Sequence, residues 1–451
     1  MSLSSQPRAT VHTLGCRLNQ AESQLLRDRL EREGYTVVPW GQPADLGIIN
    51  TCTVTREADA KCRKTIRQFI QRNPHAFTAV IGCYSQMGAK AIAEIEGVDL
   101  IVGNQDKLSV IEHARLGKSE RPVILRERIS AADFAITFVG DLPSTLRANL
   151  KIQDGCDFYC SFCIIPTARG RARSRDWENT LAEARELAAN GVREVVLTGV
   201  NIGTYHSQGH DLVALVDALD TIEGLDRVRI SSIEPTTVEL ALLDRMADPA
   251  HALVPYLHLP LQSGSDPVLQ RMRRKYSVAE YAAFVAEARR RVPDLCLGTD
   301  ILVGSDGETA AHFQETCDFF WQQPFAYCHV FPYSEREGTL AVKRQRNDPA
   351  CVVPVEERQQ RVARLRRLSA AKRHDYDAGY LGETVEILVE QPRDGLWPGY
   401  TANYVRVLAQ ADASFGDLRN QLVRVRLERL SADFAEGTVV EVVGRPVAAA
   451  V

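Results

Sequence analysis

The sequence lacks long apolar runs. No window approaches the roughly 18 uncharged apolar residues that a membrane-spanning helix needs. The first residues, MSLSSQPRAT, contain no apolar segment of the kind that a secretory signal carries. We therefore expect a cytoplasmic protein with no membrane partner, in a compartment that keeps thiols reduced.

An excess of positive charge is also missing. The chain has 54 Lys and Arg against 58 Asp and Glu, which gives a net charge of -4. This balance excludes a uniformly basic nucleic-acid coat, although a local basic face is still compatible with it. Repeats and low-complexity tracts are absent as well, so 451 residues indicate two or three ordinary globular domains.

Cysteine, by contrast, is frequent. Eleven cysteines stand at positions 16, 52, 62, 83, 156, 160, 163, 296, 317, 328 and 351. An odd total suits a complete disulfide framework poorly. In a reducing compartment, clustered cysteines are more often metal ligands or catalysts than disulfide partners.

Residues 8–116 alternate short apolar runs with helical patterns, which predicts βαβ units on a parallel sheet. The expected strands are 9–15, 44–50, 77–82 and 98–103, and the expected helices are 19–34, 56–72, 86–96 and 107–114. A linker of mixed polarity is expected over residues 117–146. The fold class predicted for this first domain is therefore α/β.

Residues 147–375 are expected to form a second domain, in which the alternation continues with a longer period. Its apolar runs are 150–156, 193–201, 227–235, 256–262, 295–304 and 326–334. Six such units favour a partial (β/α)6 barrel over a second open sheet. Functional residues are then expected at the carboxyl ends of the strands.

The last part of the chain changes character twice. Residues 343–374 read as helical and basic, with ten Lys and Arg against three Asp and Glu. Residues 381–446 alternate apolar and polar residues, which predicts a small antiparallel β-barrel. This barrel is acidic, so RNA binding by it would depend on shape and on aromatic stacking by Trp397, Tyr400 and Tyr404, unless these side chains form its core.

Three cysteines fall in the stretch GCDFYCSFC, residues 155–163. Cys156, Cys160 and Cys163 have the spacing C-x3-C-x2-C. A zinc site would normally take further ligands from a second pair along the chain, and no such pair exists. Three thiolates on one loop can instead bind three irons of a 4Fe-4S cube and leave the fourth iron open for a cofactor or substrate. The alternative is three buried or zinc-binding thiols.

A second set of cysteines follows three expected strands. Cys16, Cys52 and Cys83 each stand directly after one of them. Because carboxyl ends in a parallel sheet lie on one edge, we expect these thiols to converge and to hold a second cluster with an open iron. Taken singly, each could be a small buried residue. Cys62, on an expected helix, is the remaining thiol with the strongest claim to an unexpected role.

The loop CSFCIIPTARG, with six βα units behind it, resembles that of the radical S-adenosylmethionine superfamily. In that family the cofactor's amino and carboxylate groups chelate the open iron, and an electron from the cluster cleaves it to a 5′-deoxyadenosyl radical. With the second set in an α/β domain before the barrel, the chain resembles the methylthiotransferase family, whose C-terminal RNA-binding barrel is of TRAM type.

The resemblance implies cofactors, partners and roles. It implies two 4Fe-4S clusters, S-adenosylmethionine, tRNA and an external electron donor, and it leaves the sulfur donor undetermined. The cluster on Cys156, Cys160 and Cys163 would generate the radical, and that on Cys16, Cys52 and Cys83 would carry the sulfur. Cofactor contacts are implied for Thr198, Gly199, Ser232, Glu234, Gln262 and Ser263, for which satisfaction of local backbone is the alternative.

The substrate is suggested by the segments around the first cysteines. TLGCRLNQAES and NTCTVTREADAKCRK look most like the branch that adds a methylthio group to C2 of N6-threonylcarbamoyladenosine next to the tRNA anticodon. The alternatives are isopentenyl-adenosine tRNA, a ribosomal protein, or a non-catalytic iron-sulfur sensor or electron carrier. Electron carriers normally supply four protein ligands to each cluster, whereas both sets here stop at three.

Two arginine clusters are candidates for phosphate contacts. Alternate arginines follow the cluster loop, and RMRRKY gathers four more basic residues. Guanidinium groups match phosphate oxygens, so a basic surface around the barrel mouth is predicted, with solvated ion pairs as the alternative. The residues are Arg169, Arg171, Arg173, Arg175, Arg271, Arg273, Arg274 and Lys275.

Overall fold

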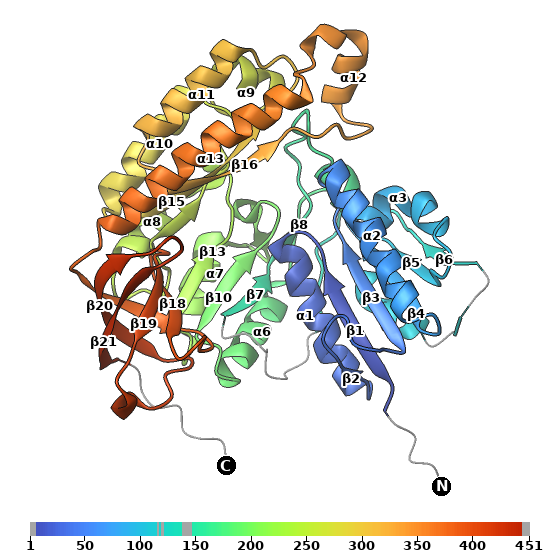
Figure 1. The fold of residues 1–451 in the computed structure, drawn as a ribbon, viewed down its shortest axis with the longest axis horizontal. Coiled ribbons are helices and arrows are strands. Elements are labelled where there is room, and N and C mark those ends of the chain that lie inside the picture. The colour runs from blue at the N-terminus through green and yellow to red at the C-terminus, as the bar shows by residue number, and fades with distance from the viewer. Residues whose placement is uncertain (1–5, 115–116, 119–120, 138–146, 444–451) are drawn as a thin grey trace.

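The computed structural model describes residues 6–114, 117–118, 121–137 and 147–443 (Figure 1). Residues 119–120 and 138–146 of the expected linker, residues 444–446 of the expected C-terminal barrel, and residues 1–5 and 115–116 lie outside this range. Among the described residues, no helix has the length and apolar character needed to cross a membrane.

A parallel six-stranded sheet forms the N-terminal part, in the order β2-β1-β3-β4-β5-β6. Its strands are β1 (Arg8–Thr13), β2 (Thr36–Val37), β3 (Leu46–Thr51), β4 (Phe77–Gly82), β5 (Leu100–Val102) and β6 (Val123–Leu125). The helices are α1 (Arg17–Arg32), α2 (Arg56–Arg72), α3 (Cys83–Ala93) and α4 (Val110–Ala114). Two apolar clusters, one on each face of the sheet, form its core, so the central strands are buried on both sides.

The sheet extends into the segment expected to be a linker. Val123–Leu125 pairs in parallel with β5, so these residues are a sixth strand and not a connector. The run is only three residues long and has no alternation, which explains why its pattern did not predict a strand. Farther on, an isolated β-bridge pairs Phe134 with Arg175, so this part of the connection lies against the second domain.

Six parallel strands build the second domain as an open, partial barrel. They are β7 (Arg147–Lys151), β10 (Glu194–Thr198), β13 (Arg227–Ile230), β14 (Tyr256–His258), β15 (Cys296–Val303) and β16 (Tyr327–Pro332). Backbone hydrogen bonds join β7, β10 and β13 on one side and β14, β15 and β16 on the other, and a bridge between Val228 and Leu253 connects the halves. The predicted α/β fold with a partial (β/α)6 barrel is confirmed.

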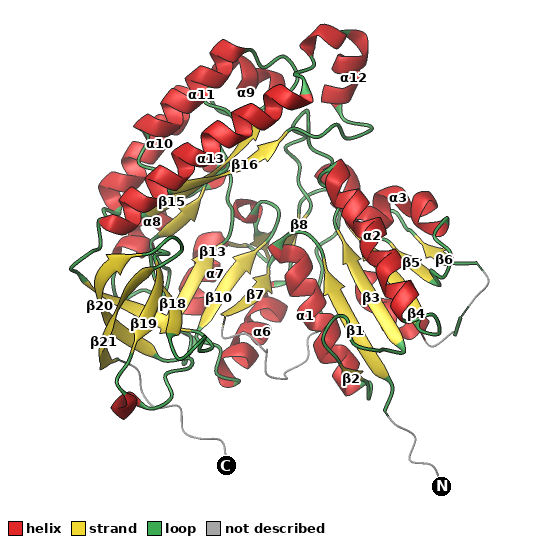
Figure 2. Cartoon of the chain, viewed as in Figure 1, coloured by secondary structure: helices red, strands yellow, loops and turns green. Residues whose placement is uncertain are grey.

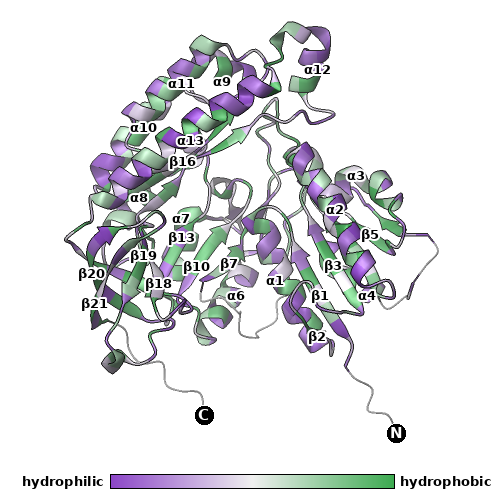
Figure 3. Ribbon diagram, in the orientation of Figure 1, coloured by the Kyte–Doolittle hydropathy of each residue, from purple (hydrophilic) through white to green (hydrophobic). Residues whose placement is uncertain are grey.

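Helices cover the outside of this barrel (Figure 2). They are α6 (Trp177–Ala189), α7 (Leu212–Asp220), α8 (Leu240–Ala247), α9 (Asp266–Met272), α10 (Val278–Arg291) and α11 (Ala310–Gln322). A short helix, α5 (Ile165–Arg169), follows the cysteine loop, and small ribbons pair β8 (Gln153–Asp154) with β9 (Arg173–Ser174) and β11 (His206–Ser207) with β12 (His210–Asp211). In Figure 3 strand β10 of the barrel is largely apolar, whereas the outer helices mix apolar and polar residues.

The basic helical region is split by prolines. It forms α12 (Leu340–Asn347) and the long α13 (Val355–Ala378), which runs along β16. Pro349 and Pro354 lie between them, and proline cannot continue a helix from within. The arginines of α13 do not all face solvent, because Arg358 and Arg361 are buried and pair with Glu335 and Glu308.

A closed five-stranded barrel ends the described chain, in the order β17-β18-β19-β21-β20. Its strands are β17 (Thr384–Val389), β18 (Trp397–Thr401), β19 (Arg406–Gln410), β20 (Leu422–Leu430) and β21 (Ala435–Val442). Four of the five pairings are antiparallel as predicted, but β19 and β21 pair in parallel. Arg227 and Arg229 of β13 donate hydrogen bonds to the carbonyl oxygens of Tyr400 and Ala402, both at 2.8 Å, which dock this barrel on the larger one.

Candidate active site with two cysteine sets

The first cysteine set lies at one edge of the N-terminal sheet. Cys16 caps the start of α1 after β1, Cys52 follows β3, and Cys83 begins α3 after β4. Because β1, β3 and β4 are neighbours and parallel, their carboxyl ends deliver the three side chains to one place. Burial, together with the nearby Cys83 and Cys16 thiols, raises the pKa of Cys52 to about 11, although a backbone hydrogen bond from Val54 acts to lower it.

The chain passes so close to Cys52 at this edge of the sheet that position 15 must be glycine. Gly15 has a φ of +106°, and a Cβ at this position would lie 2.8 Å from Cys52 Cβ and 3.0 Å from its Sγ. Only a residue without a side chain adopts this backbone conformation at no cost and leaves room for the neighbouring sulfur. Asn104 donates a hydrogen bond to Cys83 Sγ at 3.5 Å, so a polar group already faces this thiol.

The second set lies on the loop that follows β7 and β8. The amide of Cys163 donates to the carbonyl oxygen of Cys160 at 3.0 Å, and the amide of Phe158 donates to Cys156 Sγ at 3.5 Å. A left-handed Tyr159, with a φ of 48°, turns the chain between the first two cysteines. The loop is therefore a tight turn that brings its three thiols together.

Burial and a nearby cation set the electrostatics of this loop. Burial, together with the nearby Cys160 thiol, raises the pKa of Cys156 to about 11 and that of Cys163 to about 12. Arg274 donates to Cys160 Sγ at 3.4 Å and forms an ion pair with Glu234. Arg274 acts against burial at Cys163, whose pKa it lowers, and so favours the thiolate form that binds metal.

A buried network of charges connects the two sets. Glu22 of α1 pairs with Lys107 at 2.5 Å and with Lys151 of β7 at 2.8 Å, and Lys151 also pairs with Asp154 at 2.7 Å. Arg169 reaches both carboxylates. Burial acts to raise the pKa of Glu22, but Lys107, Lys151 and Arg169 outweigh it and hold that pKa far below its usual range.

Replacing Glu22 with glutamine is expected to destabilise the contact between the two domains. Three buried cations would lose a carboxylate partner, and breaking a buried ion pair costs about 3 kcal/mol of unfolding free energy. Thermal unfolding followed by circular dichroism should show a clear drop in the midpoint for E22Q. Glu31→Gln, at an exposed position on the same helix, should leave the midpoint unchanged, and equal midpoints for the two variants would contradict the prediction.

Comparison with known proteins places both cysteine-bearing parts in described families. The Radical SAM superfamily model matches residues 150–320, and the model of the Uncharacterized protein family UPF0004 matches residues 8–103. The first region contains the loop with Cys156, Cys160 and Cys163, and the second contains Cys16, Cys52 and Cys83.

Curated relatives match nearly the whole chain. A threonylcarbamoyladenosine tRNA methylthiotransferase of Bacillus subtilis is 36% identical over 96% of this chain and 97% of its own. The chain belongs to the radical S-adenosylmethionine methylthiotransferase family. A relative of the same name from Aquifex aeolicus is 34% identical, over 92% of this chain and 100% of its own. A tRNA-2-methylthio-N(6)-dimethylallyladenosine synthase of Roseobacter denitrificans is 33% identical, over 85% and 87%.

Solved structures share the fold of this methylthiotransferase. The radical S-adenosylmethionine methyltransferase TsrM of Kitasatospora setae aligns with a TM-score of 0.51 and 16% identity, over 72% of this chain and 75% of its own. The cobalamin-dependent radical enzyme OxsB aligns with a TM-score of 0.52 and 12% identity, over 79% and 56%. The likeness supports an α/β domain followed by a partial barrel.

The spacing of the thiols in this methylthiotransferase suits clusters better than single metal ions. Within the described part of the chain, the one group of three or more candidate ligands whose atoms lie within 4.8 Å of one another is His258, Asp300 and His329. The thiols of each cysteine set are therefore spread more widely than ligands of one ion. A 4Fe-4S cluster with three protein ligands takes one thiolate on each of three separate irons. Three thiols that lie farther apart than the ligands of one ion therefore fit such a cluster.

Three of the residues expected to contact the cofactor are engaged with backbone or with a neighbouring strand. Thr198 is buried, and its hydroxyl donates to the carbonyl oxygen of Val196 at 2.9 Å. Gly199 lies against Gln153, where a Cβ would come within 2.8 Å of the amide oxygen. Gln262 has a left-handed backbone, with a φ of 70°, and its backbone N–H donates a hydrogen bond to the carbonyl oxygen of Asp300 at 2.8 Å.

The other three residues expected to contact the cofactor do not all lie in the same place. The half-buried Ser232 follows β13, and Glu234, two residues on, pairs with Arg274 beside the cluster loop, so both stay at this end of the barrel. Ser263 instead makes a hydrogen bond with Thr316 of α11 at 3.1 Å. Its hydroxyl thus faces the outer helix layer, and Ser263 is left out of the proposed cofactor site.

Cys62 lies behind the first cysteine set. Its side chain is fully buried, and its thiol donates to the carbonyl oxygen of Cys52 at 3.4 Å. Burial raises the pKa of Cys62 to about 12. These contacts give Cys62 a supporting role in holding the strand end that carries Cys52.

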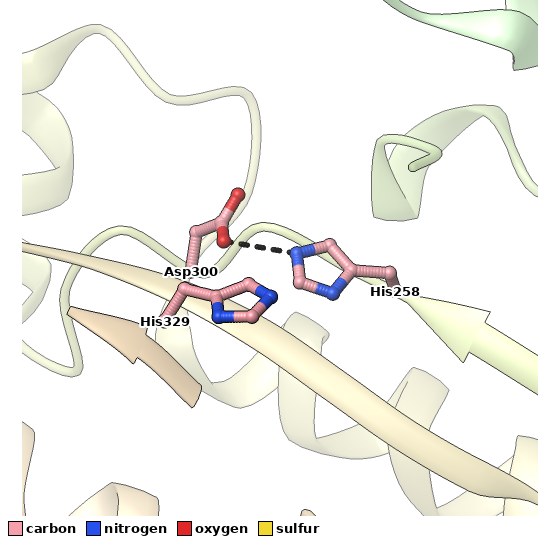
Figure 4. Close-up of side chains that lie close together, drawn as sticks. All are labelled: His258, Asp300 and His329. Carbon is pink, nitrogen blue, oxygen red and sulfur yellow. Dashed lines mark ion pairs between the residues drawn. The ribbon is translucent and has the colours of Figure 1, made fainter. Parts of the chain in front are cut away.

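Three polar residues that the sequence patterns did not single out meet inside the barrel (Figure 4). His258 of β14 and Asp300 of β15 form an ion pair at 2.9 Å, and His329 of β16 stacks on His258 with ring centroids 5.4 Å apart. Asp300 and His329 are direct partners in the strand register. Polar residues in the middle of apolar strand runs were the available signal, because alternate positions of adjacent strands share a face.

Most of the arginines predicted to contact phosphate are buried, so that prediction is wrong for them. Arg169 and Arg175 are almost fully buried and pair with Asp154 and Glu183. Arg173 and Arg274 are likewise enclosed, with side chains 7% and 2% exposed. Arg271 is partly exposed and pairs with Asp306 at 2.8 Å. The basic positions that stay open to solvent are Arg273 and Lys275, while Arg171 is exposed but paired with Asp157.

The three aromatic side chains of the C-terminal barrel that were candidates for stacking on RNA make contacts within the protein. Trp397 packs on the core of the small barrel. Tyr400 stacks on Tyr404 with centroids 5.0 Å apart, and Arg147 of the larger barrel lies 4.4 Å from the centre of the Tyr400 ring. These tyrosines therefore belong to the joint between the two barrels rather than to an open stacking surface.

Two pockets border the His258, Asp300 and His329 group. A cavity of about 250 Å³ is bounded by Val54 and Thr55, just after Cys52, and by Phe162 and Cys163 of the barrel loop. A second pocket of about 530 Å³ lies between the two barrels. Asp300 lines the smaller pocket and His329 lines the larger one, so the polar group borders both.

Proposed function

We propose that this chain is a tRNA methylthiotransferase that replaces the hydrogen at C2 of N6-threonylcarbamoyladenosine with a methylthio group. The observation that carries the proposal is the presence of two incomplete cysteine sets that face one joint between domains. The relatives named for this activity, at 36% and 34% identity over nearly full length, support it.

The proposal assigns each set to one 4Fe-4S cluster. Cys156, Cys160 and Cys163 would hold the cluster that binds S-adenosylmethionine, and Cys16, Cys52 and Cys83 would hold the other. When bound, these cofactors supply the radical chemistry that an unactivated C–H bond requires, together with the sulfur and the methyl group. An external electron donor completes the partners that we propose.

The chain's own residues hold and shield these groups. Gly15 leaves space beside Cys52, and Asn104 and Arg274 direct N–H groups at Cys83 and Cys160. The buried network around Glu22 ties α1 to β7, which sets the distance between the two sets. The walls of the 250 Å³ cavity combine apolar side chains, among them Phe162 and Leu302, with the polar Asp300, and the apolar part limits the access of water to a reactive centre.

Dimethylallyladenosine in tRNA is the second candidate substrate, because a relative named for that product is 33% identical. The alternative of a non-catalytic iron-sulfur protein is disfavoured by both sets stopping at three thiols.

Nucleosides from tRNA of a strain that lacks this gene test the substrate. Mass spectrometry should show that the methylthio form of threonylcarbamoyladenosine disappears and that the unmodified precursor accumulates. The methylthio form of dimethylallyladenosine in the same sample is the internal control and should persist. Loss of the latter with retention of the former would favour the second candidate, and no change in either would reject a tRNA substrate.

A further inference from the structure

The larger pocket is basic. It lies where α1, β16, α13 and the C-terminal barrel meet, and its volume is about 530 Å³. Its lining includes four arginines against two aspartates, an imbalance that favours anionic ligands. The arginines are Arg17, Arg366, Arg373 and Arg406.

Arg17 differs from the other three by its place and its contacts. Arg373 pairs with Asp377 at 2.8 Å, Arg406 lies 4.0 Å from the centre of the Phe434 ring, and Arg366 is exposed on α13. Arg17 is half-buried at the first position of α1, next to Cys16. Among the described residues no carboxylate forms an ion pair with it, and its Nη2 donates to the hydroxyl of Tyr404 at 3.3 Å.

The charge of Arg17 acts on the polar group inside the barrel. The pKa of His329 is lowered chiefly by burial, then by His258 and to a smaller extent by Arg17, while Asp300 acts to raise it. His329 lines the same pocket as Arg17. Arg17 lies beside the mouth of the barrel, and no carboxylate of the described chain is paired with it. It can therefore pair with an anionic group of the substrate.

The two candidate substrates differ in charge at N6. A threonylcarbamoyl group is a threonine joined through its amine, so it keeps a free carboxylate, whereas a dimethylallyl group is a hydrocarbon. In adenine, N6 and C2 lie on either side of the ring nitrogen N1. A side chain next to Cys16, where the sulfur is proposed to be held, is therefore also near the substituent on N6.

We propose that Arg17 binds the carboxylate of the threonylcarbamoyl group and makes this pocket a subsite for an anionic N6 substituent. The inference rests on the proposed function. Tyr404 orients the guanidinium by accepting one of its hydrogen bonds, and the remaining N–H groups form the charge-assisted contacts that a carboxylate takes from arginine.

Binding without turnover tests this subsite. Cluster-reconstituted protein, kept free of reductant, is titrated with three labelled anticodon stem-loop RNAs, and fluorescence anisotropy gives each Kd. The RNAs carry threonylcarbamoyladenosine, its methyl amide, in which the carboxylate is neutral, or unmodified adenosine. We expect wild-type protein to bind the carboxylate form about tenfold more tightly than the methyl amide.

Arg17→Gln should abolish this preference while its iron content and its affinity for the unmodified RNA stay at the wild-type level. Arg17→Lys, which keeps the charge but not the fork of donors, should retain part of the preference. Arg67→Gln, which removes an exposed arginine on α2, is the matched control and should keep all of it.

Failure of the subsite and failure of the proposed function give different results. If R17Q still prefers the carboxylate over the methyl amide by the wild-type ratio, the role of Arg17 is overturned and the proposed function stands. If wild-type protein binds the modified and unmodified RNAs equally, the substrate assignment is overturned together with the subsite.

Discussion

Replacing Cys16, Cys52 and Cys83 together with alanine is expected to lower the iron content from about eight to about four per chain, because one 4Fe-4S cluster is lost. The variant should still produce 5′-deoxyadenosine from S-adenosylmethionine and a reductant, since the loop with Cys160 is unchanged. It should make no methylthio product, because the proposed sulfur site is gone. Iron analysis and chromatography of the two products measure all three outcomes.

Cys317→Ala is the control for this first prediction. Cys317 is a buried thiol on α11, in the outer layer of the barrel, and its loss should leave iron content and both products at wild-type levels. A triple variant that keeps eight irons, or that still makes methylthio product, would contradict the assignment of the N-terminal set.

Replacing Cys156, Cys160 and Cys163 with alanine is expected to give the reciprocal pattern. About four irons should remain, now on the N-terminal set, but production of 5′-deoxyadenosine should fall below detection. The loop contacts explain the size of the effect, because all three thiols come from one tight turn and Arg274 donates to one of them. The methylthio product should be absent as well.

Electron paramagnetic resonance of the reduced proteins separates the two sets. A signal that shifts on addition of S-adenosylmethionine is expected in wild type and in the N-terminal triple variant, and is not expected in the barrel triple variant. A shift that persists without Cys156, Cys160 and Cys163 would show that the cofactor binds elsewhere and would refute the role of this loop.

Much of the fold could be predicted from local patterns. The six barrel strands coincide with apolar runs, and the cysteines after β1, β3 and β4 are where the alternation of strand and helix places a strand end. Both signals are local in sequence, because a short hydrophobic pattern marks each strand and a break in that pattern marks its end. Val123–Leu125 was missed because a strand of three residues has too little period to read.

The buried charges could not be predicted in the same way. Arg169 looked like a phosphate contact because it belongs to a run of alternate arginines, but its partners are Asn19, Glu22 and Asp154. Glu22 lies 147 residues away in sequence, on a helix of another domain. Whether a basic residue faces solvent depends on which carboxylate the fold delivers to it, and a charge count contains no such information.

The group in Figure 4 shows an intermediate case. His258, Asp300 and His329 lie on three neighbouring strands, so their meeting required both the strand order and the register. The sequence predicted the strands but not which side of each strand faces inward. A shift of one residue in any of the three would turn its side chain to the helix layer.

The central claim is that two incomplete cysteine sets in one chain form a single centre for methylthio insertion at threonylcarbamoyladenosine. The most direct measurement is mass spectrometry of an anticodon stem-loop RNA carrying that nucleoside, after incubation with reconstituted protein, reductant, sulfide and S-adenosylmethionine. We predict that a methylthio group appears on the modified adenine. Release of 5′-deoxyadenosine with the RNA left unchanged would contradict this claim.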